Sequence, residues 1–403
     1  MQRTLIIIAT IVILLGGGAG VYFYFFSGGS GLAVSPSGTG SATFPEATQG
    51  TTASSTGSSS GQASGVAAAP TKVSSRLIQI DQGPVVPGEV LTTVPAQNAS
   101  SSPDIAVHYI KRESGNVYSY LINAETLTRT SNRTIPGIQE AAWLPDASMA
   151  FVRFLSGADF STINTYRLAA DGSSGTMLAT NISDVQTASS SLLTVASGDG
   201  GSIATISNPD GSKPSNAFST PLTMIHSQIT DNGYLVYTKP SATLNGYAFL
   251  VNKKGVFTRI AGPLKGLVAL ASPTGKYAVV SYVDGSAIKT ELVTTATGAA
   301  TALPISTIAD KCVWAKDESS VYCGVPVTSD TNYTYPDDWY QGAAHFSDRI
   351  WKIDVQGRYA ALVLDFSGET KTELDATALA IDENNQDIVF LNKNDGSLWL
   401  YRL

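Results

Sequence analysis

A turn that recurs at a nearly constant interval constrains this chain more than any other feature of its sequence. The turn is clearest at Ser272-Pro273-Thr274-Gly275, between the apolar segments Leu267–Ala271 and Tyr277–Tyr282. Similar turns are centred on five other positions: Asp146, Ser190, Asn232, Asp317 and Glu383. The interval is about 42 residues, except that the last one is longer by about 24. No segment of this region keeps a helical period, so the repeat predicts a series of similar all-β units.

Each unit contains short strand-like segments in the order expected of a β-propeller blade. An apolar strand leads into the turn, a strongly apolar strand follows it, and a third and a more polar fourth strand close the unit. The leading strands are predicted at Ile138–Trp143, Met224–Ile229, Leu267–Ala271, Ile308–Trp314 and Ala376–Ile381. We therefore predict an all-β domain over residues 76–403 that forms a seven-bladed propeller. A miscounted unit would make six or eight blades.

The two ends of this domain are predicted to share one blade. The last unit stops at Leu403 after three strands, and Leu77–Ile80 is an apolar segment without a unit of its own. Pairing Leu77–Ile80 with the last unit would close the ring and leave no open edge. Glu89–Val94 and Ile105–Ile110 then begin the first blade.

Three of the turns carry a recognisable motif. They read Trp143-Leu144-Pro145-Asp146-Ala147-Ser148, Ala271-Ser272-Pro273-Thr274-Gly275-Lys276 and, more loosely, Trp314-Ala315-Lys316-Asp317-Glu318-Ser319. This pattern resembles the Trp-Ser-Pro-Asp-Gly-Lys turn of the TolB-type and WD40-like bacterial propeller repeats. The resemblance implies a propeller and often a protein-binding role. The Gly-His and Trp-Asp pairs of eukaryotic WD40 repeats are absent from the sequence.

The N-terminal segment predicts a membrane anchor. Thr4–Phe26 contains no charged residue, and 23 helical residues span roughly 35 Å, enough for a bilayer core. Arg3 precedes this segment and Glu46 is the first charge after it, so we expect the N-terminus inside the cell and the rest outside. We assign residues 1–26 to a signal anchor of a single-pass cell-membrane protein. A cleaved signal peptide is the alternative, and it also exports the domain.

Residues 27–75 are predicted to be a flexible linker. They consist largely of Gly, Ser, Thr, Ala and Pro and have almost no large apolar side chains. Such a segment cannot bury enough surface to offset the entropy lost on ordering.

Composition argues against several function classes. The formal net charge is −7 and the sequence has no basic cluster, which argues against a nucleic-acid partner. With three His and two Cys in the whole chain, we expect neither a metal site nor a cofactor.

The two cysteines are predicted to pair. If the hairpin turn centres between Asp317 and Glu318, Cys312 lies opposite Cys323 and Trp314 opposite Val321. Opposed residues on neighbouring strands can form a disulfide, and export would supply the oxidising environment. Two buried free thiols are the alternative.

The one long unit contains the candidate binding site. Its additional residues, 331–346, fall between the second and third strands of the sixth blade, on the side where connections surround the channel mouth. The candidate ligand-binding residues are Tyr333, Tyr335, Asp337, Asp338, Trp339, Tyr340 and His345. Aromatic rings beside carboxylates can stack on a sugar or hold a peptide. Alternatively, these rings cap the channel or pack on the next blade.

No catalytic residue is predicted from the sequence. Asp337 and Asp338 could belong to an acid/base pair or bind Ca²⁺, but adjacent loop residues rarely point at one atom. His108 and His226 are interpreted as residues at the edge of the core. We therefore expect a binding or scaffold module for an envelope protein, peptide or glycan. A propeller-type glycan hydrolase or lyase is the alternative.

Overall fold

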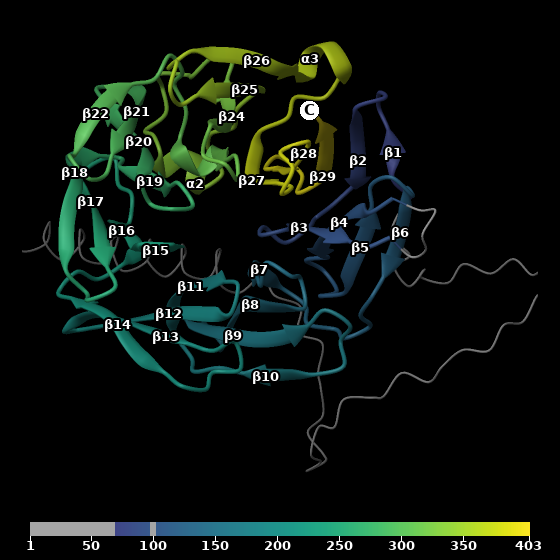
Figure 1. The fold of residues 1–403 in the computed structure, drawn as a ribbon, viewed down its shortest axis with the longest axis horizontal. Helices are drawn as coiled ribbons and strands as arrows, with labels where there is room; N and C mark the ends of the chain where they lie inside the picture. The colour runs from purple at the N-terminus through teal and green to yellow at the C-terminus, as the bar shows by residue number, and fades with distance from the viewer. Residues whose placement is uncertain (1–68, 97–101) are drawn as a thin grey trace, which may run out of the picture. The chain divides into compact units, whose positions relative to one another are not determined.

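The chain folds into a ring of seven antiparallel sheets (Figure 1). The computed structural model describes residues 69–96 and 102–403. Seven sheets confirm the predicted all-β propeller and its blade number, and six or eight blades are ruled out. The segment predicted as an anchor and most of the predicted linker lie outside the described residues. Within the described residues, no helix is long and apolar enough to cross a membrane.

Blades 1 to 6 each consist of four consecutive strands. In blade 1 these are β3 (Val90–Val94), β4 (Asp104–Ile110), β5 (Val117–Leu121) and β6 (Thr126–Arg129); in blade 2, β7 (Ile138–Trp143), β8 (Met149–Ser156), β9 (Thr162–Ala169) and β10 (Gly175–Met177); in blade 3, β11 (Ile182–Ala188), β12 (Ser191–Gly198), β13 (Gly201–Ser207) and β14 (Ser215–Thr220). In blade 4 they are β15 (Ile225–Thr230), β16 (Gly233–Thr238), β17 (Asn245–Asn252) and β18 (Phe257–Lys265); in blade 5, β19 (Val268–Ala271), β20 (Tyr277–Asp284), β21 (Ala287–Thr294) and β22 (Ala299–Ala302); in blade 6, β23 (Cys312–Trp314), β24 (Ser320–Pro326), β25 (Asp348–Asp354) and β26 (Ala360–Asp365). In Figure 1 the first strands β3, β7, β11, β15 and β19 lie nearest the ring centre.

Blade 7 closes the ring with strands from both ends of the domain. It contains β27 (Ala376–Ile381), β28 (Asp387–Asn392), β29 (Leu398–Arg402), β2 (Leu77–Asp81) and β1 (Thr71–Lys72). The predicted closure is confirmed, because Leu77 pairs with Tyr401 and Ile78 with Leu400.

Strand β1 lies inside the range predicted to be a linker. Residues 71–72 pair with β2, although they fall within the range assigned to the linker. Both side chains of β1 are exposed, so the strand is held by backbone pairing and leaves no signal in the composition.

The repeated turns join neighbouring blades. Asn232 donates from Nδ2 to the carbonyl of Thr274 at 2.7 Å, and Thr274 donates from its hydroxyl to Glu318 at 3.0 Å. Gly275 has φ of 76°, and Ala147 and Glu318 take similar left-handed values at the matching position of their own turns. The motif therefore supports the left-handed backbone conformation of the turn and forms contacts between blades.

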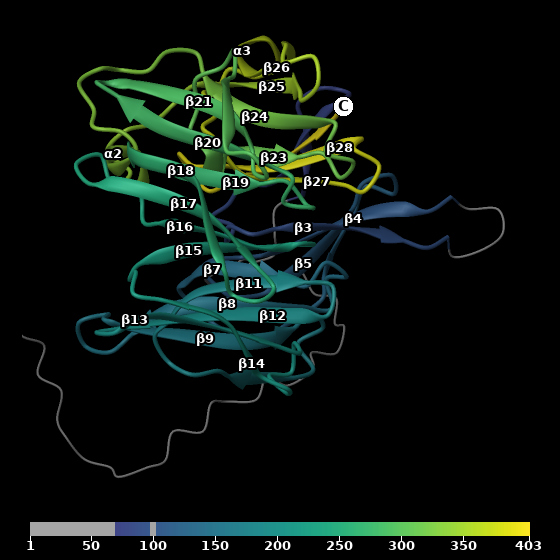
Figure 2. The same cartoon turned by 60° about the vertical axis from the view of Figure 1, so that its left-hand side comes forward.

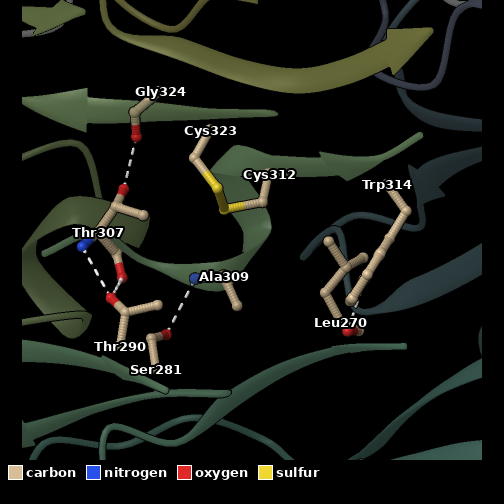
Figure 3. The surroundings of a disulfide bond; sticks show 9 residues. All are labelled: Leu270, Ser281, Thr290, Thr307, Ala309, Cys312, Trp314, Cys323 and Gly324. Atoms are coloured by element: carbon tan, nitrogen blue, oxygen red, sulfur yellow. Dashed lines mark hydrogen bonds between the residues drawn. A yellow bond between two sulfur atoms is a disulfide. The ribbon is translucent and has the colours of Figure 1, made fainter. Parts of the chain in front are cut away.

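Blades 5 and 6 are linked around the only two cysteines (Figure 3). β23 and β24 pair in the predicted register, Cys312 opposite Cys323 and Trp314 opposite Val321, and a disulfide joins the two cysteines. Trp314 donates from Nε1 to the carbonyl of Leu270 at 3.2 Å, which ties blade 6 to blade 5.

The first strand of blade 6 is shorter than predicted. The segment Ile308–Trp314 contains a 3₁₀ turn, η1 (Ala309–Lys311), before β23 begins. The backbone N–H of Ala309 donates to the hydroxyl of Ser281 at 2.9 Å instead of extending the strand (Figure 3). This turn places the two neighbouring side chains in different surroundings: Lys311 is fully buried, whereas Asp310 is half-buried.

Candidate functional site

The long loop of blade 6 runs from β24 to β25 and contains one short helix, α2 (Asp337–Tyr340). Connections between the second and third strands leave the ring on the same side as the connections between blades; we call this side the channel face. Figure 1 shows α2 on the inner side of blade 6, between β19 and β27. In the turned view it lies at the edge of the ring near the start of β17 (Figure 2).

One half of the loop is packed into the protein. Tyr335 and Trp339 are each only 2% exposed. The ring of Phe346 stacks on that of Tyr335 with centroids 5.3 Å apart, and on that of Trp339 at 6.3 Å. These two candidate residues therefore have the packed arrangement that the sequence left open, and they support the loop from beneath.

A buried ionic group holds both ends of this loop. The Lys311 ammonium lies 2.8 Å from Oδ2 of Asp348 and also pairs with Asp375, and all three side chains are fully buried. Asp375 accepts hydrogen bonds from Nε1 of Trp339 at 3.0 Å and from the backbone of Phe346 at 3.1 Å. Burial raises the pKa of Asp348 to about 6, because one lysine cannot fully offset the desolvation of two carboxylates.

The two predicted carboxylates hold the loop in place. Both oxygens of Asp337 accept from the backbone N–H of Ala242, at 3.1 and 3.2 Å, and so join α2 to the β16–β17 connection. Asp338 accepts from the backbone N–H of Thr334 at 2.6 Å, within the loop itself. Across residues 69–96 and 102–403, no group of three His, Cys, Asp or Glu side chains is arranged to hold a metal ion.

A cleft of about 710 Å³ opens beside α2, and we call it the channel-face cleft. Its walls come from the segment before β15, the β16–β17 connection, η1 and α2. Large apolar side chains are unusually open to solvent here: Met224 is 64% exposed and Leu244 71%. Tyr340, at 41% exposed, contributes an aromatic ring.

Asp310 and His226 supply the polar groups of the cleft. Tyr340 donates from its hydroxyl to Oδ2 of Asp310 at 2.5 Å. Burial raises the pKa of Asp310, and the Tyr340 hydrogen bond and the nearby charge of His226 partly oppose this rise. The His226 ring stacks on that of Tyr237 with centroids 5.2 Å apart. Burial and the Asp310 charge raise the pKa of both tyrosines well above the usual range, so both remain protonated donors.

The residues predicted from the sequence include one wall of this cleft and omit the others. Of the seven candidate residues, only Asp337 and Tyr340 line it. Tyr333 and His345 are exposed on the loop outside the cleft lining. The interpretation of His226 as a core-edge residue is wrong: its side chain is exposed and lines the cleft.

One signal could have indicated the missing residues. Asp310 and Lys311 place opposite charges side by side in a segment that was predicted to be an apolar leading strand.

His108, unlike His226, is half-buried. It is hydrogen-bonded to the hydroxyl of Thr92 at 2.9 Å, and burial lowers its pKa to about 4.

No family model and no curated protein matches the sequence. Among solved structures, an oligogalacturonate lyase from Vibrio parahaemolyticus is similar at a TM-score of 0.52 and 8% identity, over 81% of this chain and 93% of that one. The hydrazine synthase of Kuenenia stuttgartiensis is similar at a TM-score of 0.51 and 12% identity, over 79% of this chain and 96% of that one. TolB from Acinetobacter baumannii is also found, at a TM-score of 0.43 and 10% identity, over 78% of this chain and 80% of that one.

These similarities show the propeller fold alone. TolB, which the repeated turns resemble, is among the similar structures, but its TM-score of 0.43 carries no further argument. The WD40-like assignment stays a prediction.

Proposed function

We propose that this protein is a membrane-tethered binding propeller that holds an envelope protein, peptide or glycan in the channel-face cleft. Residues 4–26 would anchor it in the cell membrane, and the linker would hold the propeller outside the cytoplasm. One observation carries the binding role: exposed apolar side chains and a half-buried carboxylate converge in one open cleft on a rigid ring. Ligand sites commonly combine apolar walls with a few placed polar groups.

The backbone at Met224 supports this proposal. Met224 has φ of 52°, a left-handed backbone conformation that is uncommon for residues other than glycine. Such conformations cost free energy and gather at functional sites. This conformation places the Met224 side chain, which is 64% exposed, at the cleft. Burial of the side chain within the fold therefore does not offset the free-energy cost of the conformation.

Tyr340 is suited to contact a ligand without loss of order. Its hydroxyl is fixed on Asp310 at 2.5 Å, and its ring lies 5.1 Å from that of the buried Trp339. A ring held in this way presents apolar area at a low entropic cost on binding.

Capture from an envelope fraction tests the binding role. The full-length chain with Met224→Ser and Leu244→Ser is expected to retain its ligand about tenfold less than wild type, because two exposed apolar contacts are lost. The matched control carries Val256→Ser and Tyr359→Ser, which are similarly exposed but lie in connections on the opposite side of the ring. Equal capture by both variants would refute the cleft as the binding site.

Asp310 supports the enzymatic alternative, a glycan hydrolase or lyase. A carboxyl group with a raised pKa, facing a histidine over an open cleft, has the properties of a general acid. The capture experiment separates the two functions. An enzyme would convert the retained ligand, and the ligand would persist unchanged on an Asp310→Asn variant.

A further inference from the structure

We infer that the channel-face cleft takes a cationic group attached to an apolar chain, such as a lysine side chain next to an apolar residue of a peptide. This inference rests on the proposed binding function and names its ligand chemistry. Three features of the cleft carry it: an unpaired carboxylate, an apolar wall beside it, and the arrangement of the remaining charges.

The first feature is the carboxylate of Asp310. Three other carboxylates of the ring have a cation of their own: Asp81 pairs with Lys111 at 2.5 Å, Glu140 with Arg153 at 2.7 Å and Asp348 with Lys311 at 2.8 Å. Within residues 69–96 and 102–403, Asp310 forms no ion pair with a lysine, an arginine or His226. The side chains that hydrogen-bond to Asp310 are those of two neutral tyrosines, Tyr340 and Tyr237. A ligand cation would supply Asp310 with the counter-charge that the fold gives to these three carboxylates.

The second feature is the apolar wall. Met224 and Leu244 line the same cleft as Asp310 and are 64% and 71% exposed. The Tyr340 ring adds a π-face, against which an ammonium group or its aliphatic stem can pack. A small inorganic cation would leave this apolar surface in water, whereas an aliphatic amine would cover it.

The third feature is the set of other charges around Asp310. Asp337 lines the cleft, but both of its oxygens already accept from the backbone N–H of Ala242. Lys239 is exposed on the lining, so a second ligand cation would meet repulsion. An acidic ligand would bring a negative group towards both Asp310 and Asp337. The arrangement favours one positive charge and disfavours an acidic glycan.

Three probes with side chains of similar length test this inference by ligand-observed NMR titration of the full-length chain at low salt. They are acetyl-leucyl-lysine amide, the same compound with norleucine in place of lysine, and the same compound with α-aminoadipate. The lysine probe is expected to bind about tenfold more tightly than the norleucine probe, because a charge-assisted hydrogen bond adds to the same apolar contact. The aminoadipate probe is expected to bind most weakly.

Two variants assign the preference to the cleft. Asp310→Asn is expected to bring the lysine probe down to the level of the norleucine probe, while the control Asp171→Asn, an exposed aspartate in the β9–β10 connection, leaves the preference intact. Met224→Ser is expected to weaken the lysine and norleucine probes by the same factor and to keep their ratio. This second variant still tests the inference if Asp310→Asn fails to fold.

The outcomes separate this inference from the proposed function. Equal or stronger binding of the norleucine or aminoadipate probe overturns the cationic ligand, and the binding function survives if that binding is lost with Met224→Ser. Absence of binding by all three probes also overturns the inference, and the capture experiment then decides the proposed function independently. A lysine preference that persists in Asp310→Asn excludes the cleft carboxylate as its cause.

Discussion

Replacement of Lys311 with methionine is expected to lower the free energy of unfolding by about 3–5 kcal/mol at pH 7, because it leaves Asp348 and Asp375 buried without a cation. The same side chain lies 5.1 Å from the centroid of Trp339 and 5.0 Å from that of Phe346, so the loop that carries α2 loses its support as well. Denaturant unfolding at equilibrium measures the loss.

The dependence on pH distinguishes this mechanism from a simple packing defect. Asp348, whose pKa is raised by burial, can take up a proton in the variant, so the loss should be smaller at pH 5 than at pH 7. Lys311→Met combined with Asp348→Asn and Asp375→Asn should recover much of the stability, because no buried charge remains. The control Lys289→Met removes an exposed lysine from β21 and should change stability by less than about 0.5 kcal/mol. A loss for Lys311→Met that is the same at both pH values would contradict the ionic explanation.

Glu89→Gln is expected to stabilise the protein, increasingly so as the pH rises. Glu89 is 6% exposed, and its only hydrogen-bond donor within the described residues is the backbone of Gly88, at 3.2 Å to Oε2. Burial raises its pKa from 4.5 to about 8. The fold thus favours the protonated carboxyl group. Its contribution to stability is fully present below pH 4.5 and is lost as the pH rises through 8. This rise in the pKa of Glu89 corresponds to about 5 kcal/mol of unfolding free energy that is lost at high pH. A neutral glutamine would not lose it.

Comparison of the two proteins over a pH series checks this expectation. The difference in unfolding free energy between Glu89→Gln and wild type should grow between pH 5 and pH 8. Other titrating groups are common to both proteins and cancel in the difference. Glu113→Gln, an exposed glutamate in the β4–β5 connection, should show no such growth. A constant difference across the series would mean that Glu89 ionises normally in the folded state.

The fold could be predicted from the sequence because its determinants are periodic and local. The turn at Ser272–Gly275 recurs at one interval, and each recurrence is flanked by apolar segments that occupy the core. The closing strand could be predicted for the same reason. Leu77–Ile80 is a strongly apolar segment without a partner in its own part of the chain, and three of its four side chains are almost fully buried.

The candidate site could be predicted only in part, because it combines segments that are distant in the sequence. The extra length of the sixth unit revealed the loop that carries Tyr340 and Asp337. Asp310 lies in the cleft because the chain forms a 3₁₀ turn where a strand was predicted. In this turn Lys311 points towards the buried aspartates and pairs with them. Met224 comes from the connection between blades 3 and 4, and Leu244 comes from the β16–β17 connection of blade 4. Neither stands out in the sequence from an ordinary surface residue.

Photo-crosslinking in the native cell tests the central claim most directly, namely that the channel-face cleft is where this propeller holds its ligand. A photoreactive phenylalanine analogue would replace Leu244 in the cleft in one strain and Val256, in the β17–β18 connection on the opposite side of the ring, in another. We predict a discrete crosslinked species from position 244 and none from position 256. A species that forms equally at both positions, or only at position 256, would contradict the assignment of function to the cleft.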